Sequence, residues 1–377
     1  MSATLAAILG GAVGAVTLVG IVILVFWVCR RTMSAASETG SSEGSIQVGR
    51  HAGIEMSLQE ARRFDMEELS MATKHFSERN LIGVGKFSEV YKGLLNNGML
   101  VAIKKRPGAP SHEFVQEVRY ISAIQHRNIV SLLGYCQDSN LQLLVYEYIP
   151  NGSVSTHLYG AGHISDGKLE FKNRLGIALG AAKGLAHLHS LTPRLIHKDF
   201  KTAKVLIDEN FNPKVADAGL CNLLGTPDPA GTSSHLTADE IFLAPEVKEF
   251  RRYSDKSDVY SFGIFLLELL SGREATESPS PEFNQSLVEW LQHNQDYSKF
   301  SNIIDRRLGS RFTVQGMEEF IRLAMRCVEV SSERRPSMSY MTLELERILD
   351  REMSLTTVMV EGMPDVTLGS KLFRSTK

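Results

Sequence analysis

The chain has 377 residues, of which 43% are hydrophobic and 22% charged, the balance of a globular protein with at least one large core. Its formal net charge of −2 at pH 7 excludes the overall basicity typical of nucleic-acid-binding proteins, so we expect no nucleic-acid partner. The four cysteines lie at scattered spacings, which excludes a disulfide framework or a zinc site and predicts reduced thiols.

The first predicted element is a transmembrane helix over residues 4–29. No charged side chain occurs from residue 4 to residue 28, and about 25 residues of helix cross a hydrocarbon core of about 30 Å. Arg30 and Arg31 follow at once and no positive side chain precedes the segment. This charge bias places residues 1–3 outside the cell and the rest of the chain in the cytoplasm. The alternative is a cleaved signal peptide, although that class usually has a positive n-region and a shorter apolar stretch.

Residues 30–62 are rich in Ser, Gly, Ala and Glu without apolar periodicity, which predicts a flexible juxtamembrane linker. A short helical pattern and several strand-like segments follow, and after residue 151 the pattern is mostly helical. Strands first and helices later predict two unlike lobes in one α+β domain over residues 63–350, with a tail over residues 351–377. The predicted helices cover residues 66–76, 112–124, 153–158, 171–190, 257–271, 286–292, 317–330 and 337–347, and the predicted strands lie near residues 81–82, 90–91, 101–103 and 143–145.

Residues 83–90 resemble the glycine-rich loop of a protein kinase, in which the backbone at Gly83 and Gly85 can approach phosphates. Alone the run is weak evidence, because glycines often mark an ordinary hairpin. It gains weight because a Val-Ala-Ile-Lys motif ending at Lys104 follows on a predicted strand, and Lys104 then supplies an ammonium for the α- and β-phosphates. In this resemblance the adenine-side contacts come from Ile82, Val90, Ala102 and Leu206.

Three further positions complete the nucleotide half of the resemblance. Glu117, on a predicted helix, matches the acidic partner that holds Lys104; its other interpretation is a solvated glutamate on a helix face. Glu147 and Tyr148 match the hinge between the lobes, whose backbone groups would face adenine, and Tyr146 would guard the pocket behind them.

The phosphoryl-transfer half of the resemblance lies in residues 196–220. His197, Lys198 and Asp199 stand where a kinase has His-Arg-Asp, so Asp199 matches the catalytic base that accepts the substrate hydroxyl proton. Lys201, two residues later, resembles the phosphate-binding lysine of Ser/Thr-directed kinases. Asp217 matches the carboxylate that holds the metal bridging the phosphates.

C-terminal motifs and finer details narrow the family. Glu246, in an Ala-Pro-Glu motif, and Arg335 would form a buried structural ion pair, and residues 258–263 complete the pattern of the second lobe. Segments that resemble plant receptor-like kinases of the Pelle-related type lie at residues 76–77, 90–93, 126–130, 133–136 and 150–153. The resemblance covers residues 64–349. It implies a bilobal protein-kinase fold, ATP and Mg²⁺ between the lobes, protein substrates or partner kinases, and signalling at the plasma membrane.

Two departures from the family pattern lie inside the active site. Where the loop normally has a metal-binding Asn, Lys204 presents an ammonium, which cannot ligate Mg²⁺ and repels it. The same charge is attracted to Asp217 and to phosphates, so we hypothesise that Lys204 replaces part of the metal; the alternative is that its flexible stem swings into solvent. Ala218 removes the Phe ring expected between His197 and the helix of Glu117, a truncation that costs about 3–5 kcal/mol unless neighbours fill the space.

Two more departures affect the activation segment. Lys198 replaces the Arg that clamps a phosphorylated segment, and it pairs without a bidentate fork. Asp239 takes the position of a Thr that would touch Asp199 and Lys201, so substrate positioning is impaired. Residues 232–234 are Thr and Ser, and they are either phosphorylation sites or plain loop.

Three interpretations follow from these residues. The first is a membrane-anchored Ser/Thr kinase with reduced turnover. The second, which we carry forward, is a pseudokinase or weakly active kinase that binds ATP with weakened Mg²⁺ binding and whose conformation is sensed by partner kinases. The third is an interaction domain that binds no nucleotide. Retention of Lys104, Asp199 and Asp217 argues against the third, because a fold without chemistry does not need all three.

Overall fold

The computed structural model describes residues 61–85, 88–159, 169–220, 238–276, 287, 300, 303–309 and 311–360. All of them belong to one compact unit of the chain, Ser57–Lys377. The predicted transmembrane helix at residues 4–29 and nearly all of the predicted linker lie outside the described residues. Within the part that is described, no helix is both long and apolar enough to cross a membrane.

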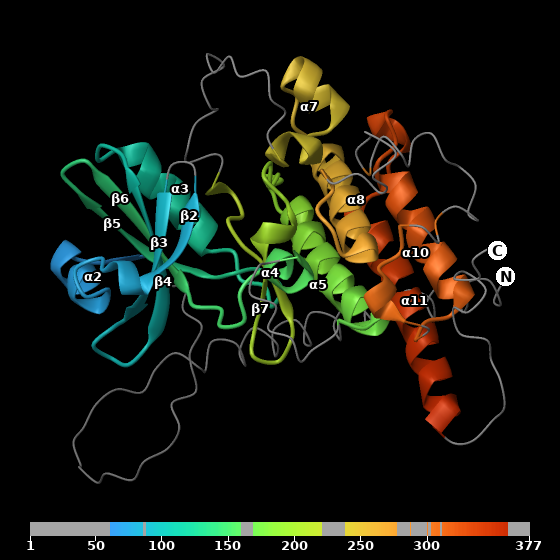
Figure 1. The fold of residues 1–377 in the computed structure, drawn as a ribbon. Coiled ribbons are helices and arrows are strands. Elements are labelled where there is room, and N and C mark those ends of the chain that lie inside the picture. The colour runs from blue at the N-terminus through green and yellow to red at the C-terminus, as the bar shows by residue number, and fades with distance from the viewer. Residues whose placement is uncertain are drawn as a thin grey trace, which may run out of the picture. The chain divides into compact units, whose positions relative to one another are not determined.

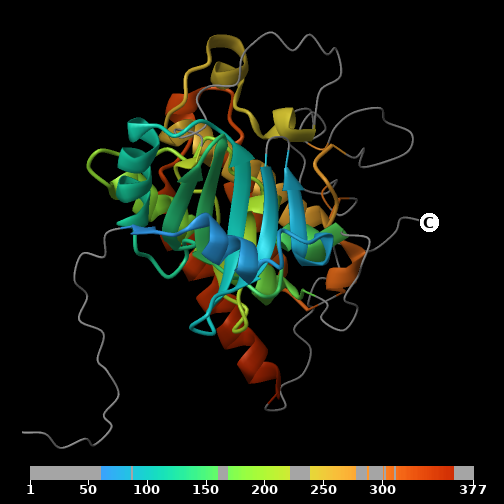
Figure 2. The same cartoon turned by 90° about the vertical axis from the view of Figure 1, so that its left-hand side faces the viewer.

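The first half of this unit is a six-stranded sheet with a helix on each face (Figures 1 and 2). The strands lie in the order β1-β5-β6-β4-β3-β2, and neighbours are antiparallel except for β1 and β5. The elements are β1 Arg62–Arg63, α2 Met66–Ala72, β2 Leu81–Gly85, β3 Ser88–Leu94, β4 Leu100–Pro107, α3 His112–Ser122, β5 Leu132–Asp138 and β6 Leu141–Glu147.

Alternation along β4 decides which side chains reach the space between the lobes. Val101 and Ile103 are fully buried in the cluster that includes Leu69 of α2. Ala102 lies on the other face and packs against the cluster that includes α3. Because side chains on a strand repeat every two residues, Lys104 shares the face of Ala102.

The second half of the unit is built around α8 (Figure 1). Every residue from position 257 to position 271 is buried, as expected for a helix that is apolar on all sides. A capping box between Ser254 and Ser257 starts this helix, and Gly272, at φ 64°, ends it. The elements are α4 Val154–Tyr159, α5 Phe171–Ser190, β7 Val205–Ile207, β8 Pro213–Val215, α7 Pro245–Phe250, α8 Asp255–Ser271, α10 Val314–Cys327 and α11 Met338–Val360, with 3₁₀ segments at Glu78–Asn80, Thr202–Lys204, Ala238–Phe242, Arg306–Leu308 and Ser332–Arg334.

The predicted α+β architecture, a β-rich first lobe followed by a helical second lobe, is confirmed. One boundary differs: α11 runs to Val360, past the predicted start of the tail at residue 351. The buried carboxylate of Glu352 accepts a hydrogen bond from Thr313 N at 3.1 Å, and this contact holds the additional turns against the start of α10. The predicted helix at residues 286–292 falls almost wholly outside the described residues.

Candidate active site

A buried aspartate on α8 holds the backbone of the catalytic loop. Asp258 accepts hydrogen bonds from His197 N at 2.8 Å and from Lys198 N at 3.0 Å, and His189 Nε2 lies 2.8 Å from the same carboxylate. Lys198 has a φ of 67°, a left-handed conformation that is uncommon for a residue other than glycine. The charge-assisted bonds from the two loop amides to Asp258 stabilise that conformation.

The imidazole of His197 joins the loop to the strand that precedes Asp217. Its Nδ1 accepts a hydrogen bond from Asp199 N at 3.3 Å, so the proton must sit on Nε2, which donates to Ala216 O at 2.9 Å. Ala216 N donates to Lys204 O at 2.8 Å. These bonds bring Asp199, Lys204 and Asp217 to one point between the lobes.

Three ammonium groups and two carboxylates form a continuous ionic cluster at this point. Lys104 Nζ lies 2.9 Å from Asp217 Oδ2, and Lys204 Nζ contacts the same oxygen. Lys204 Nζ also lies 3.7 Å from Asp199 Oδ2, while Lys201 Nζ lies 3.4 Å from Asp199 Oδ1. The expected attraction of Lys204 to Asp217 is confirmed, and the alternative of a lysine that swings into solvent is wrong.

Burial and the two lysines act in opposite directions on Asp217. Burial raises the pKa of its carboxyl, but the ammonium groups of Lys204 and Lys104 more than reverse this and hold the pKa well below its usual range. Burial lowers the pKa of Lys104, with Lys204 acting in the same direction and Asp217 against it. Asp217 is therefore an anion at physiological pH, and both of its neighbours are cationic side chains of this chain.

The expected ion pair between Lys104 and Glu117 is not formed. Glu117 is half-buried on α3, and its side chain makes no ion pair or hydrogen bond within the described part of the chain, because Lys104 pairs with Asp217 instead. Here the solvated-glutamate interpretation describes Glu117 correctly.

At the position of the missing Phe ring, Ala218 is buried, and the residues that follow it pack against α3. Ala218 is 6% exposed and belongs to the core of the second lobe. Leu220 is buried in the same cluster as Ile121 of α3, and a Cβ at Gly219 would lie 3.0 Å from Ile121 Cδ1. The chain directly after Ala218 is thus held against α3 by aliphatic contacts.

The predicted adenine-side residues line an incompletely covered apolar surface between the lobes. Val90, Ala102 and Leu206 are each half-buried, and Ile82 is 49% exposed. Ala102 and Leu206 pack against the same cluster. Gly83 and Gly85 both lie on β2, at the edge of the sheet. The turn between β2 and β3 lies outside the described residues.

At the predicted hinge, side chains tie the two lobes together. Glu147 Oε1 accepts from Ser131 N at 2.8 Å and lies 2.9 Å from Lys214 Nζ on β8. Tyr148 is half-buried, with Lys92 Nζ 4.5 Å from its ring centroid. Their contact with a nucleotide through backbone groups stays a prediction.

The two carboxylates at which a metal is expected to bind are both paired with lysines. Hard cations need several oxygen ligands, yet both carboxylates of the cluster contact ammonium groups. Among the described residues, no group of three or more His, Cys, Asp or Glu side chains can hold a metal. The three ammonium groups outnumber the two carboxylates, so the cluster carries a net charge of +1, which favours an anion such as a phosphate.

Two buried features support the site from the second lobe. The predicted ion pair is confirmed: Arg335 Nη1 and Nη2 lie 2.7 and 2.8 Å from the two oxygens of Glu246, a bidentate contact. Sequence reasoning missed Glu268, which is 2% exposed and accepts hydrogen bonds from Thr202 and from Ala275 N at 2.8 Å. The sequence feature that could have identified Glu268 is a single carboxylate within the apolar stretch of α8.

Residues 76–345 match the family model of the protein tyrosine and serine/threonine kinases. The chain belongs to this family. It is 39% identical over 324 residues to the proline-rich receptor-like protein kinase PERK13 of Arabidopsis thaliana, covering 83% of this chain and 43% of that protein. It is also 36% identical to the probable serine/threonine-protein kinase PBL3 of the same plant, covering 82% of this chain and 75% of that protein.

The kinase domain is therefore of the plant receptor-like type. The chain spans about half the length of the PERK relatives it matches, 43% of PERK13 and 46% of PERK1. A solved structure, the pseudokinase domain of BIR2, an immune regulator of the RLK/Pelle family, is similar with a TM-score of 0.65 and 28% identity. That match covers 79% of this chain and 92% of the BIR2 domain.

Proposed function

We propose that the chain is a membrane-anchored pseudokinase of the receptor-like type. It binds ATP between its lobes with little need for Mg²⁺, and it signals through a conformation that partner kinases sense rather than through turnover. The observation that carries this proposal is the contact of the Lys204 ammonium with Asp217.

In a working kinase the carboxylate at the Asp217 position and an Asn at the Lys204 position hold the metal that bridges the phosphates. Here Lys204 replaces the Asn, and its ammonium contacts Asp217 where the metal would lie. Two unit charges about 4 Å apart at an effective dielectric of about 20 interact by about 4 kcal/mol, and a divalent cation doubles that repulsion. Mg²⁺ therefore has to displace Lys204 from Asp217 before it can bind.

The same ammonium favours a nucleotide without metal. When bound, ATP would supply the negative charge that the site lacks, and Lys104 and Lys204 would hold its phosphates while Val90, Ala102 and Leu206 cover the base. The lysines are already in place, so the chain carries its own counter-charge. The BIR2 domain, which is a pseudokinase, supports this use of the fold within the family.

A second observation points the same way. Lys104 pairs with Asp217 and not with Glu117, and Ala218 provides no ring between α3 and the catalytic loop. Active kinases need both the Lys–Glu pair and the metal-bound Asp. The chain keeps a phosphate-binding site and lacks the bracing of the active arrangement.

The second candidate is an active Ser/Thr kinase that transfers the ATP γ-phosphoryl group to protein hydroxyls. It is favoured by Asp199, whose side chain is 40% exposed and lies 3.4 Å from Lys201 Nζ, within reach of a substrate hydroxyl. In that case Asp199 would accept the hydroxyl proton, and Lys201 would offset the charge that remains.

One experiment separates the two candidates. The full-length protein is unfolded thermally with ATP in EDTA and with ATP in Mg²⁺, beside a radiolabel-transfer assay with Asp199→Asn as its control. We expect ATP at about 100 times its dissociation constant to stabilise the domain by about 2.7 kcal/mol even in EDTA, and no label above the control. Robust Mg²⁺-dependent transfer that Asp199→Asn abolishes would instead establish the active kinase.

The membrane anchor is tested separately. We expect the full-length chain to stay in the membrane pellet after an alkaline carbonate wash, and a chain that lacks residues 1–29 to be released. Release of the full-length chain would remove the anchor from the proposal and leave the nucleotide site unaffected.

A further inference from the structure

A buried carboxylate on α8 reaches the catalytic loop. Glu268 lies in the stretch of α8 where every residue from position 257 to position 271 is buried. Its Oε1 accepts a hydrogen bond from Ala275 N at 2.8 Å. Its Oε2 accepts from the hydroxyl of Tyr159 at 3.2 Å and from the hydroxyl of Thr202. No lysine or arginine in the described part of the chain is among its partners, so hydrogen bonds alone hold this carboxylate.

These three donors account for a carboxylate at this position. Burial raises the pKa of Glu268 to about 7, and the hydrogen bonds, that from Thr202 first, act in the opposite direction. A glutamine would have one acceptor oxygen and would turn an amide N–H₂ group toward one of the donors. Only a carboxylate of this length accepts from all three, so the donors, and not the apolar helix around it, call for Glu268.

Thr202 begins a short turn that needs support from outside. It is buried and opens the 3₁₀ segment Thr202–Lys204, which a backbone hydrogen bond from Lys204 N to Lys201 O at 2.8 Å closes. Segments of 3₁₀ helix have poorer hydrogen-bond geometry than α-helices. Lys201 is the N-cap residue, and a lysine has no oxygen that can accept from the first amides of the turn. The hydroxyl of Thr202 instead ties the start of the turn to α8.

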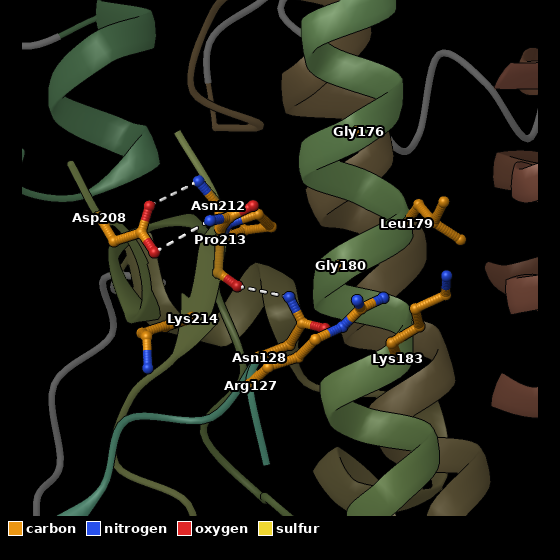
Figure 3. Close-up of a pocket in the computed structure, with 10 residues that line it drawn as sticks. All are labelled: Arg127, Asn128, Gly176, Leu179, Gly180, Lys183, Asp208, Asn212, Pro213 and Lys214. Atoms are coloured by element: carbon orange, nitrogen blue, oxygen red, sulfur yellow. Dashed lines mark hydrogen bonds between the residues drawn. The ribbon is translucent and has the colours of Figure 1, made fainter. Parts of the chain in front are cut away.

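The chain after the turn is fixed by other bonds. It forms the β7–β8 hairpin, in which Asp208 accepts from Asn212 N at 2.8 Å (Figure 3). The second strand of the hairpin is held by Asn128, whose Nδ2 donates to Pro213 O at 2.9 Å (Figure 3). These bonds do not reach the start of the turn, so the contact of Thr202 with α8 decides its position there.

The turn carries two lysines of the ionic cluster. Lys201 Nζ lies 3.4 Å from Asp199 Oδ1, and Lys204 Nζ contacts Asp217. Lys204 O also accepts from Ala216 N at 2.8 Å, which links the turn to the backbone just before Asp217. A displacement of the turn therefore shifts two ammonium groups and the carboxylate between them at once.

We propose that Glu268 is a positioning residue for the phosphate-binding lysines. Through the Thr202 hydroxyl it holds the start of the turn, and it thereby keeps the Lys204 ammonium where a phosphate of ATP would lie. This inference rests on the proposed ATP site and adds to it a residue that lies outside the site. Tyr159, on α4, donates to the same oxygen of Glu268 but carries no group of the cluster, so it offers a matched control.

The first test removes one hydroxyl at a time from the two donors of Oε2. ATP binding to the full-length protein is measured by calorimetry in EDTA for Thr202→Val and for Tyr159→Phe, each close in shape to the natural side chain. We expect Thr202→Val to weaken ATP binding about fivefold, the size of one hydrogen bond, and Tyr159→Phe to leave the affinity unchanged. Thr202→Ser, which keeps the hydroxyl, should bind as the natural chain does. Equal affinities in Thr202→Val and Tyr159→Phe, or no recovery in Thr202→Ser, would overturn the proposal.

The second test examines whether the effect passes through Lys204. In a Lys204→Met background, Thr202→Val should weaken ATP binding by less than about twofold, because the ammonium that the turn positions is absent. The same loss with and without Lys204 would contradict a role in positioning this lysine.

A third measurement needs no nucleotide, so it separates failure of this inference from failure of the ATP site. Hydrogen exchange, followed by mass spectrometry on the full-length protein, reports on the amides of Lys204 and Ala216. We expect exchange there to be about fivefold faster in Thr202→Val and unchanged in Tyr159→Phe. Absence of ATP binding in the natural chain would overturn the ATP site alone, whereas unchanged exchange in Thr202→Val would overturn the positioning role.

Discussion

The buried contacts that hold the catalytic loop and the second lobe follow the family pattern, whereas the charged residues inside the active site depart from it. In the second lobe, Asp258 holds the catalytic loop and Arg335 grips Glu246, the arrangement expected from the family pattern. Between the lobes, Lys104 and Lys204 share Asp217, an arrangement that the pattern does not have. The comparison teaches that a kinase fold can keep the parts that position its catalytic residues after the metal site itself has changed.

The largest expected effect concerns the ion pair between Arg335 and Glu246 in the second lobe. Arg335 has a fully buried side chain that also donates to Glu329 O at 2.7 Å and to Lys256 O at 2.9 Å. Arg335→Ala leaves these acceptors and Glu246 without a donor, so we expect a loss of about 3–5 kcal/mol in the free energy of unfolding, measured by urea denaturation. The exposed neighbour Arg334→Ala should change it by less than about 0.5 kcal/mol. Equal effects of the two variants would show that the stability of the domain does not depend on this ion pair.

The next effect is a pH dependence of the stability that originates in Glu268, a buried residue of α8. Burial raises the pKa of Glu268 from 4.5 to about 7, even though Thr202, Ala275 and Tyr159 donate hydrogen bonds to it. Because the folded pKa lies above the unfolded one, the associated stability is fully present below pH 4.5 and is lost as pH rises through 7. We expect a loss of about 3 kcal/mol across this window.

Glu268→Gln should remove that slope, since an amide does not titrate. The measurement is the free energy of unfolding of both proteins from pH 4.5 to pH 8. Parallel curves for the two proteins would contradict the assignment.

A smaller effect tests the space where the Phe ring is missing. Ala218 is buried, and Ile121 lies close to the next residue, so Ala218→Phe should overpack the site and lower the free energy of unfolding by about 1–3 kcal/mol. Ala218→Gly, which adds no volume, serves as the control for a change at this backbone position. A gain in stability on introducing Phe would mean that the space is still open and that the active bracing can be restored by one residue.

Long periodic segments were predictable from the sequence, whereas some of the short ones were missed. The predicted helix at residues 171–190 has the same bounds in the structure, and that at 257–271 begins two residues late, because both carry long apolar runs. The β7–β8 hairpin and α7 have three to six residues per element, too few to show a period, and they were missed.

The residues of the candidate site were predictable, but their pairing was only partly so. The family motifs identify Lys104, Glu117 and Asp217 as neighbours in space. They do not show with which of the two carboxylates Lys104 forms its ion pair. Lys104 and Asp217 are 113 residues apart, and their contact depends on how α3 packs against the second lobe.

The central claim is that Lys204 stands in for the metal, and the most direct test is the linkage between Mg²⁺ and ATP. ATP binding to the full-length protein is measured by calorimetry in EDTA and in Mg²⁺, for the natural chain and for Lys204→Asn. We expect Mg²⁺ to change the ATP affinity of the natural chain by less than about threefold and to strengthen that of Lys204→Asn by about tenfold or more, a coupling of about 1.4 kcal/mol. Tenfold strengthening by Mg²⁺ in the natural chain, or the same Mg²⁺ dependence in both proteins, would contradict it.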